Sequence, residues 1–102
     1  MPVRRNPASL WTPGFDVLLA WPPQAWEDYL YWQATDARVV KRVNELVRDA
    51  LRTPFSGLGK PEPLRFDLAG CWLRRIDREH RLVYRLDEKA SALVVLQCRY
   101  HY

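Results

Sequence analysis

The sequence predicts a single α+β domain in which two helices cover one face of an antiparallel sheet. Apolar residues recur with a helical period between Val39 and Leu51, whereas beyond Pro63 they alternate with polar residues, as they do in strands. The chain has 102 residues, which is the length of one domain. Because two helices can cover only one face of such a sheet, the other face is expected to be open.

Residues 1–14 are predicted to be an N-terminal extension, and residues 15–102 the folded domain. The extension has prolines and arginines but no apolar period, so we expect it to be poorly ordered. The segment from Phe15 to Trp21 has the pattern of a short buried strand, which Pro22-Pro23 ends. These prolines also suit the first turn of a following helix.

Two helices are predicted next. The first runs from about Pro23 to Ala34, and its Trp26 and Trp32, like Trp72 further on, are assigned to the core or an interface. Asp36 is a suitable N-cap for the second helix, which Pro54 ends. The second helix carries an apolar stripe with a period of 3.6 residues: Val39, Val40, Val43, Leu46, Val47, Ala50 and Leu51.

A proline- and glycine-rich loop, residues 53–63, separates the helices from the predicted sheet. Leu64–Leu68, Cys71–Asp77 and the segment around Leu82–Leu86 are predicted as successive strands. In the last strand the residues expected to face the helices are Ala92, Val94, Leu96 and Cys98. Short polar turns link these strands into an antiparallel meander.

The positive charge of the chain comes mainly from arginine. Thirteen of its 16 basic residues are arginine, and the net charge is +4. Arginine binds phosphate through two parallel hydrogen bonds, so this composition favours a nucleic-acid partner, although many solvated surfaces are also basic. No apolar run is long enough for a membrane helix or a signal peptide, so we expect a cytoplasmic protein without membrane contact. Cys71 and Cys98 are expected to be reduced, buried thiols rather than zinc ligands.

Alternation along the predicted strands brings polar side chains to the open face of the sheet. The set comprises Arg65, Asp67, Arg81, Arg85, Gln97, Arg99 and His101, with Glu62 just before the first strand. One interpretation is a solvated basic face. The other is a site for metal-free RNA cleavage, in which one group takes the proton of the ribose 2′-hydroxyl, another protonates the leaving oxygen, and arginine stabilises the phosphorane charge. Glu62, Arg65, Arg81 and His101 could fill these roles.

Other chemistry is less well supported by the sequence. Gly57 and Gly59 do not fit a phosphate-binding glycine loop, and two histidines without a serine or cysteine elbow argue against a triad hydrolase. The chain ends in histidine between two tyrosines, groups that can stack on bases and transfer protons, although an edge strand ending in solvent is the alternative. His80, in a turn, is expected to be an ordinary surface residue.

Six short blocks of the sequence resemble one known family. They are AWEDYLYWQ at 25–33, NEL at 44–46, GKPEPL at 59–64, RRI at 74–76, EHRLVY at 79–84 and CRYHY at 98–102. Together they resemble the YoeB/Txe toxins of the RelE-like superfamily of toxin–antitoxin systems. The resemblance runs from about Val17 to the last residue, and GKPEPL and CRYHY are its most specific blocks.

The resemblance implies a RelE-like microbial RNase fold and a ribosome-dependent endoribonuclease that cuts mRNA in the ribosomal A site without a cofactor. It implies that Glu62 is the general base, His101 the general acid, Arg81 the group that holds the scissile phosphate, and Tyr102 a residue that positions the nucleotide. Three further arginines are assigned to substrate binding: Arg65, Arg75 and Arg99.

The partner that the resemblance implies is a YefM-like antitoxin whose C-terminal segment wraps the toxin and blocks its site. Homodimers, and heterotrimers or heterotetramers with the antitoxin, are expected. Operator DNA is expected to be bound only by the toxin–antitoxin complex.

The sequence departs from the family pattern at several positions. Arg65 stands where the family has lysine, Phe66 where it has histidine, and Pro22-Pro23 where the first helix begins with an acidic residue or serine. Residues 1–16 have no family counterpart. Two other functions stay open: a non-catalytic, degenerate toxin that acts as a nucleic-acid-binding or antitoxin-binding co-repressor, and a free-standing ribonuclease.

Overall fold

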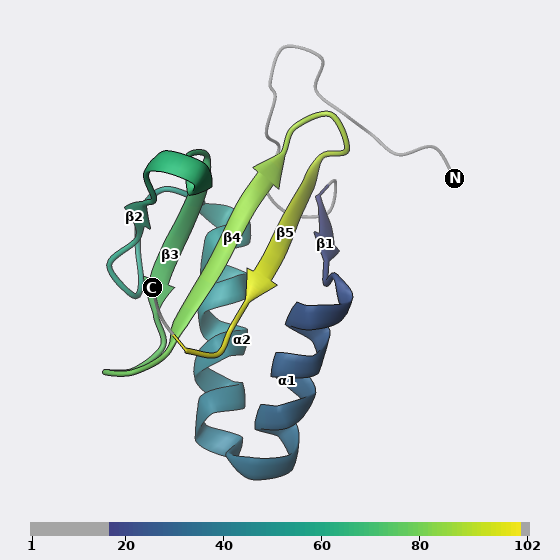
Figure 1. Ribbon diagram of the computed structural model, residues 1–102, viewed down its shortest axis with the longest axis vertical. Helices are drawn as coiled ribbons and strands as arrows, with labels where there is room; N and C mark the ends of the chain where they lie inside the picture. Colours follow the sequence, from purple (N-terminus) through teal and green to yellow (C-terminus); the bar gives the residue numbers. More distant parts are fainter. Residues whose placement is uncertain (1–16, 101–102) are drawn as a thin grey trace.

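The computed structural model describes residues 17–100, in which two helices lie on one face of a five-stranded sheet (Figure 1). The helices are α1 (Pro23–Thr35) and α2 (Ala37–Arg52). The strands are β1 (Leu18–Ala20), β2 (Glu62–Pro63), β3 (Cys71–Arg75), β4 (Arg81–Asp87) and β5 (Ala92–Gln97), and a 3-10 turn, η1 (Phe66–Leu68), precedes β3. The predicted α+β class, with helices on one face, is confirmed.

The strand order across the sheet is β1-β5-β4-β3-β2. β3, β4 and β5 form the predicted antiparallel meander, β2 pairs antiparallel with β3, and β1 pairs parallel with β5. The first strand was expected to be buried and to span Phe15 to Trp21. Within the described residues it covers only 18–20, and Leu18 is 64% exposed because β1 is an edge strand with a neighbour on one side only.

Both helices begin as the sequence predicts. Pro23 occupies the first turn of α1, where its missing N–H is no loss. The Asp36 carboxylate caps α2 by accepting hydrogen bonds from the backbone N–H groups of Arg38 (3.0 Å) and Val39 (3.3 Å). The apolar stripe of α2 packs on the sheet, with Val40 and Leu51 at its half-buried margins; the core around it includes Val39, Val43, Leu46, Val47, Ala50, Leu82, Tyr84, Leu93 and Val95.

The strand predicted over Leu64–Leu68 is wrong. Pairing with β3 covers Glu62 and Pro63 and ends with one further hydrogen bond, from Leu64 N–H to Cys71 O (2.9 Å). The chain then turns into η1, where Phe66 has a φ of 58° and is 90% exposed. Proline donates no hydrogen bond to a ladder, and a left-handed residue cannot continue an extended strand, so the apolar alternation here did not produce one.

The alternation predicted for the last strand is also only partly right. Leu93 and Val95 face the helices, whereas Ala92 and Val94, which were expected there, lie on the opposite face. A register shift between β4 and β5 at Val83/Tyr84 is the cause, since Val83 pairs with Gln97 and Tyr84 with Val95, which leaves Leu96 as an extra residue. Such a bulge reverses the side-chain alternation on either side of it.

A fully buried arginine, Arg74 on β3, lies between the sheet and α2. Its Nη1 donates to the carboxylate of Asp49 on α2 at 2.6 Å, and its Nε donates to the Tyr84 hydroxyl on β4 at 2.9 Å. The remaining donors reach backbone carbonyls of the loop after α2: Leu58 (3.0 Å), Thr53 (2.6 Å) and Ser56 (2.9 Å). Each of the five N–H donors of the guanidinium therefore has an acceptor.

The groups that bind Arg74 form further hydrogen bonds of their own. Asp49 Oδ2 accepts the Leu58 N–H at 2.9 Å, and the Tyr84 hydroxyl donates to Pro54 O at 2.6 Å. Gly59 then passes against β3 with a φ of 79°, and its carbonyl accepts the Arg75 N–H at 2.7 Å. A Cβ at Gly59 would lie 2.8 Å from Leu46 Cδ2, so this close approach requires glycine. The network thus fixes the segment that leads into Glu62.

We expect Asp49→Ala to destabilise the fold by about 3–5 kcal/mol, because it leaves the Arg74 cation buried and unpaired. Chemical denaturation of the full chain measures this loss. Arg52→Ala is the matched control, since Arg52 contacts the same carboxylate at 3.1 Å but its side chain is 72% exposed, and we expect it to cost less than about 1 kcal/mol. Equal losses in the two variants would contradict the role given to Arg74.

The same carboxylate predicts a pH dependence. Burial tends to raise the pKa of Asp49, but hydrogen bonds from Leu58, Arg74 and Arg52 outweigh it and hold the pKa below 3.8. Because the unfolded chain then binds the proton more readily, the ionised group stabilises the fold fully above about pH 3.8, and this contribution is lost as the pH falls through the lower folded pKa. Asp49→Asn should therefore show a shallower loss of stability on acidification than the parent chain. Parallel acid profiles for Asp49→Asn and the parent would refute this assignment.

Candidate functional site

Three of the predicted site residues lie on the sheet face opposite the helices. Glu62 pairs with Leu73, Leu73 with Val83, and Arg75 with Arg81. Residues directly opposite each other in a ladder, and residues two apart in one strand, project to the same face. Glu62, Arg75 and Arg81 therefore share one face, and Glu62 is separated from the β4 strand by two strand spacings, about 10 Å.

Arg81 is the most closely held of these three side chains. Its Nη1 donates to the backbone carbonyls of Asp77 (2.7 Å) and His80 (3.1 Å), which fixes the orientation of the half-buried guanidinium. Glu62 and Arg75 are exposed. Val83, which lies between Arg81 and Arg85 on this face, is fully buried.

Of the other arginines predicted on this face, Arg85 shares it with Arg81, whereas Arg65 and Arg99 lie elsewhere. Arg65 lies at the start of η1, outside the ladder, because the strand expected there does not form. Arg85 pairs with Cys71, four residues along β4 from Arg81. Arg99 turns toward α1, where its guanidinium carbon lies 3.5 Å from the centre of the Tyr31 ring. Substrate binding by Arg65, Arg75 and Arg99 stays a prediction.

The end of the described chain runs back toward Arg81. After β5, the Tyr100 carbonyl accepts the Arg81 N–H at 2.8 Å, so residue 100 lies beside the start of β4. His101 and Tyr102, the predicted general acid and nucleotide-positioning residue, lie outside the described residues. They follow Tyr100 directly in the chain.

His80 is not the ordinary surface residue that was predicted. Its side chain is only 12% exposed, its ring packs edge-on against Trp32 with 4.7 Å between the ring centres, and its Nδ1 accepts the Tyr100 N–H at 2.7 Å. Of the tryptophans assigned to the core or an interface, Trp32 is buried, Trp72 packs partly buried against the core and Trp26 is 43% exposed. A histidine in a polar turn gives no sequence signal of a contact 20 residues away.

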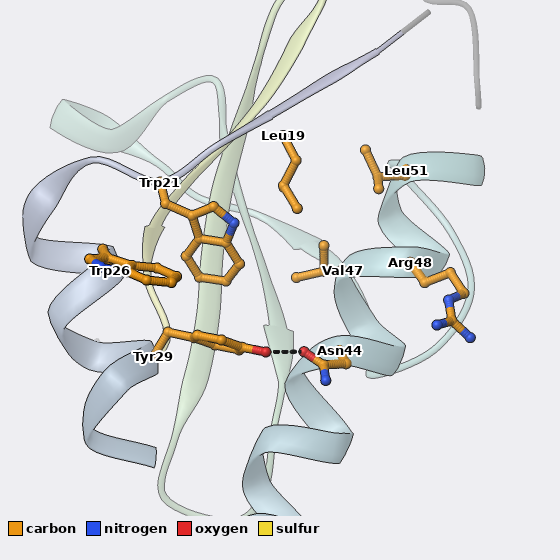
Figure 2. Close-up of a pocket in the computed structure, with 8 residues that line it drawn as sticks. All are labelled: Leu19, Trp21, Trp26, Tyr29, Asn44, Val47, Arg48 and Leu51. Atoms are coloured by element: carbon orange, nitrogen blue, oxygen red, sulfur yellow. Dashed lines mark hydrogen bonds between the residues drawn. The ribbon is translucent and has the colours of Figure 1, made fainter. Parts of the chain in front are cut away.

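A groove lies away from these residues, between β1 and the two helices. Figure 2 shows this groove of about 320 Å³, in which the Tyr29 hydroxyl donates to Asn44 Oδ1 at 2.7 Å. It is lined by Leu19, Trp21, Trp26, Tyr29, Asn44, Val47, Arg48 and Leu51. The sequence did not predict it, because its wall joins an edge strand to two helices. No histidine, aspartate or glutamate is among these lining residues, and the groove lies on the other side of the sheet from Glu62.

Cys71 and Cys98 are free and buried, as predicted. Burial, with a smaller contribution from the nearby Asp28 carboxylate, raises the pKa of the Cys98 thiol to about 12. Among residues 17–100, no group of three or more histidine, cysteine, aspartate or glutamate side chains is arranged to hold a metal ion. Neither helix of this part of the chain is long and apolar enough to cross a membrane.

Comparison with known proteins shows the family to which this chain is related. Residues 21–102 match the family model described as "YoeB-like toxin of bacterial type II toxin-antitoxin system". Toxin YoeB of Escherichia coli K12 is 56% identical over 84 residues, which are 82% of this chain and 98% of the relative. The chain belongs to the YoeB toxin family. The match includes the blocks that carry Glu62, Arg81, His101 and Tyr102.

Solved structures of YoeB proteins have the same fold. A YoeB/ParE toxin from Agrobacterium tumefaciens is 56% identical, with a TM-score of 0.81 over 83% of this chain and 99% of that one. The Staphylococcus aureus YoeB, solved as a dimer and in a heterotetrameric YoeB-YefM complex, is 42% identical, with TM-scores of 0.77 and 0.76 over 84% of this chain and 98% of that one. The predicted RelE-like architecture is thus confirmed for this YoeB-family chain.

Proposed function

We propose that this YoeB-family toxin is a ribosome-dependent endoribonuclease that cleaves mRNA in the ribosomal A site and so inhibits translation. The observation that supports the proposal most strongly is that the sheet register places Glu62, Arg75 and Arg81 on one face, while the chain end returns to Arg81. In the proposed site, the base Glu62 and the cationic group Arg81 share one face, and the proposed acid His101 is the residue that follows Tyr100 in the chain.

The proposed reaction needs only groups of this chain and the RNA itself. Glu62 takes the proton of the ribose 2′-hydroxyl, and the 2′-oxygen attacks the adjacent phosphorus. Arg81 stabilises the negative charge that develops on the phosphoryl oxygens, with its guanidinium already oriented by the carbonyls of Asp77 and His80. The bond to the 5′-oxygen breaks, and His101 gives that oxygen a proton. The products are a 2′,3′-cyclic phosphate and a 5′-hydroxyl end.

Tyr102 is proposed to position the nucleotide. Substrate binding is assigned to three arginines: Arg65, Arg75 and Arg99.

Dependence on the ribosome follows from the shape of this face. Glu62 is exposed at a short edge strand, so it does not enclose a flexible RNA. In-line attack requires the 2′-oxygen, the phosphorus and the 5′-oxygen to be aligned, and this alignment supplies much of the rate. A ribosome that holds mRNA in its A site can provide that order, which also places the action of the toxin in the cytoplasm.

We propose a YefM-like antitoxin as the protein partner. The support is the heterotetrameric YoeB-YefM complex of a relative that shares 42% of its residues with this chain. A net charge of +4 and an arginine-bearing face favour an acidic antitoxin segment that covers Arg65, Arg81 and the chain end. Binding of operator DNA is assigned to the toxin–antitoxin complex, and a homodimer of the free toxin is expected by analogy with the dimeric relative.

We expect Glu62→Gln, Arg81→Ala and His101→Gln each to lower cleavage of ribosome-bound mRNA by about 10²–10⁴-fold, because each removes one proton-transfer or charge-stabilising group. The assay incubates the full chain with 70S ribosomes carrying a defined A-site codon, beside the same mRNA free in solution with EDTA. The fold of each variant is checked by thermal unfolding.

The matched controls are Glu45→Gln and Arg38→Ala, which change the same residue types on exposed positions of α2 and should retain full activity. Cleavage of both RNAs would indicate a free-standing nuclease. A folded, ribosome-binding chain that cleaves neither RNA would support the non-catalytic co-repressor instead.

A further inference from the structure

Side chains of α1 hold the backbone where β5 ends. The Cys98 N–H donates to the Asp28 carboxylate at 3.1 Å, and the Cys98 carbonyl accepts the Trp32 indole N–H at 2.8 Å. Both hydrogen-bonding groups of this residue are therefore bound by one helix, and its thiol is buried beneath them. Residue 98 is thus fixed three residues before His101.

Tyr100 is held by two hydrogen bonds to consecutive residues, His80 and Arg81. Its N–H donates to His80 Nδ1 at 2.7 Å, and its carbonyl accepts the Arg81 N–H at 2.8 Å. Tyr100 has a φ of 67°, a left-handed conformation that a residue with a bulky side chain adopts only when its surroundings impose it. These two hydrogen bonds supply that constraint immediately before His101.

His80 is itself immobilised by the turn between β3 and β4. Asp77 Oδ1 accepts the N–H groups of Glu79 (2.8 Å) and His80 (2.7 Å), which fixes the backbone of the turn. The imidazole ring packs edge-on against Trp32, and its Nε2 lies 3.8 Å from Glu79 Oε1. An Nδ1 that accepts a hydrogen bond carries no proton, so His80 is in its Nε2–H tautomer.

We propose that His80 is a positioning residue of the cleavage reaction: its Nδ1 holds the backbone of Tyr100, the residue before His101, next to Arg81. Its catalytic consequence rests on the proposed function, whereas the contact itself does not. His80 and Arg81 are consecutive, so one turn both orients the guanidinium that holds the phosphate and anchors the segment that carries the acid. His80 acts through the backbone and needs no contact with RNA.

Two substitutions separate the hydrogen bond from the packing of the ring. His80→Asn places an amide oxygen near the position of Nδ1 but removes the ring from Trp32. His80→Phe keeps a ring against Trp32 but has no acceptor. If the hydrogen bond positions the chain end, His80→Asn should retain more cleavage activity than His80→Phe. If the ring only supports the fold, His80→Phe should retain more.

The first readout is amide hydrogen exchange of Tyr100 by NMR on the full chain. We expect His80→Phe to exchange at least about tenfold faster at this amide than the parent, while His80→Asn stays close to the parent. The ¹⁵N shift of His80 in the parent should report an unprotonated Nδ1. Unchanged exchange of the Tyr100 amide in His80→Phe, or a protonated Nδ1 in the parent, would overturn the contact. Neither measurement depends on cleavage activity.

The second readout is the ribosomal cleavage assay. We expect His80→Phe to lose about 10²-fold in kcat, since misplacement of an acid by about 1 Å can have that effect, with little change in KM. His80→Asn should recover most of kcat. An inactive His80→Asn with a protected Tyr100 amide would overturn the positioning role. If the parent chain does not cleave, the proposed function fails, and the exchange data alone decide whether His80 anchors the chain end.

Discussion

One buried guanidinium, that of Arg74, binds three parts of the molecule at once: α2, β4 and the loop after α2. It reaches α2 through Asp49, β4 through Tyr84, and the loop after α2 through three backbone carbonyls. A cation removed from water is tolerated only when it is fully paired, so the carboxylate and the loop conformation are needed together. The path of this loop then brings Gly59 against β3, and Glu62 follows three residues later.

The candidate site is consequently built by two separate constraints. The pairing of β2 with β3 and of β3 with β4 places Glu62, Arg75 and Arg81 on one face of the sheet. The loop before β2 sets this pairing, because its Gly59 carbonyl is bound to the Arg75 N–H of β3. Side chains, rather than a strand, direct the chain end: Asp28 and Trp32 hold residue 98. Arg81, the proposed phosphate-binding residue, is oriented by two backbone carbonyls, and Glu62, the proposed base, follows a loop that hydrogen bonds hold against β3.

The sequence predicted the features that depend on periodicity, and missed those that depend on pairing between distant segments. The α2 stripe, the Asp36 cap and the antiparallel meander follow from local rules, and they were correct. The bulge that reverses the early half of β5 and the replacement of the Leu64–Leu68 strand by η1 arise from register and proline placement, which a period of two does not reveal. The hydrogen bonds of Arg74 could not be predicted from the sequence, because an arginine within a strand is usually exposed to solvent. Glu62 and Arg81 were proposed first from strand alternation and the chemistry of RNA cleavage, and the family resemblance then assigned their roles, whereas His80 was misassigned.

The most direct test of an active face opposite the helices is a structure of the full chain on a ribosome whose A-site mRNA carries 2′-O-methyl ribose to prevent attack. The Glu62 carboxylate should lie within about 3.2 Å of that 2′-oxygen, or be bridged to it by one water where the methyl group intervenes. The Arg81 guanidinium should lie against the scissile phosphate, and His101 next to the 5′-oxygen. An A-site phosphate bound instead against α2 or in the aromatic groove of Figure 2, with Glu62 facing solvent, would contradict the assignment of this face.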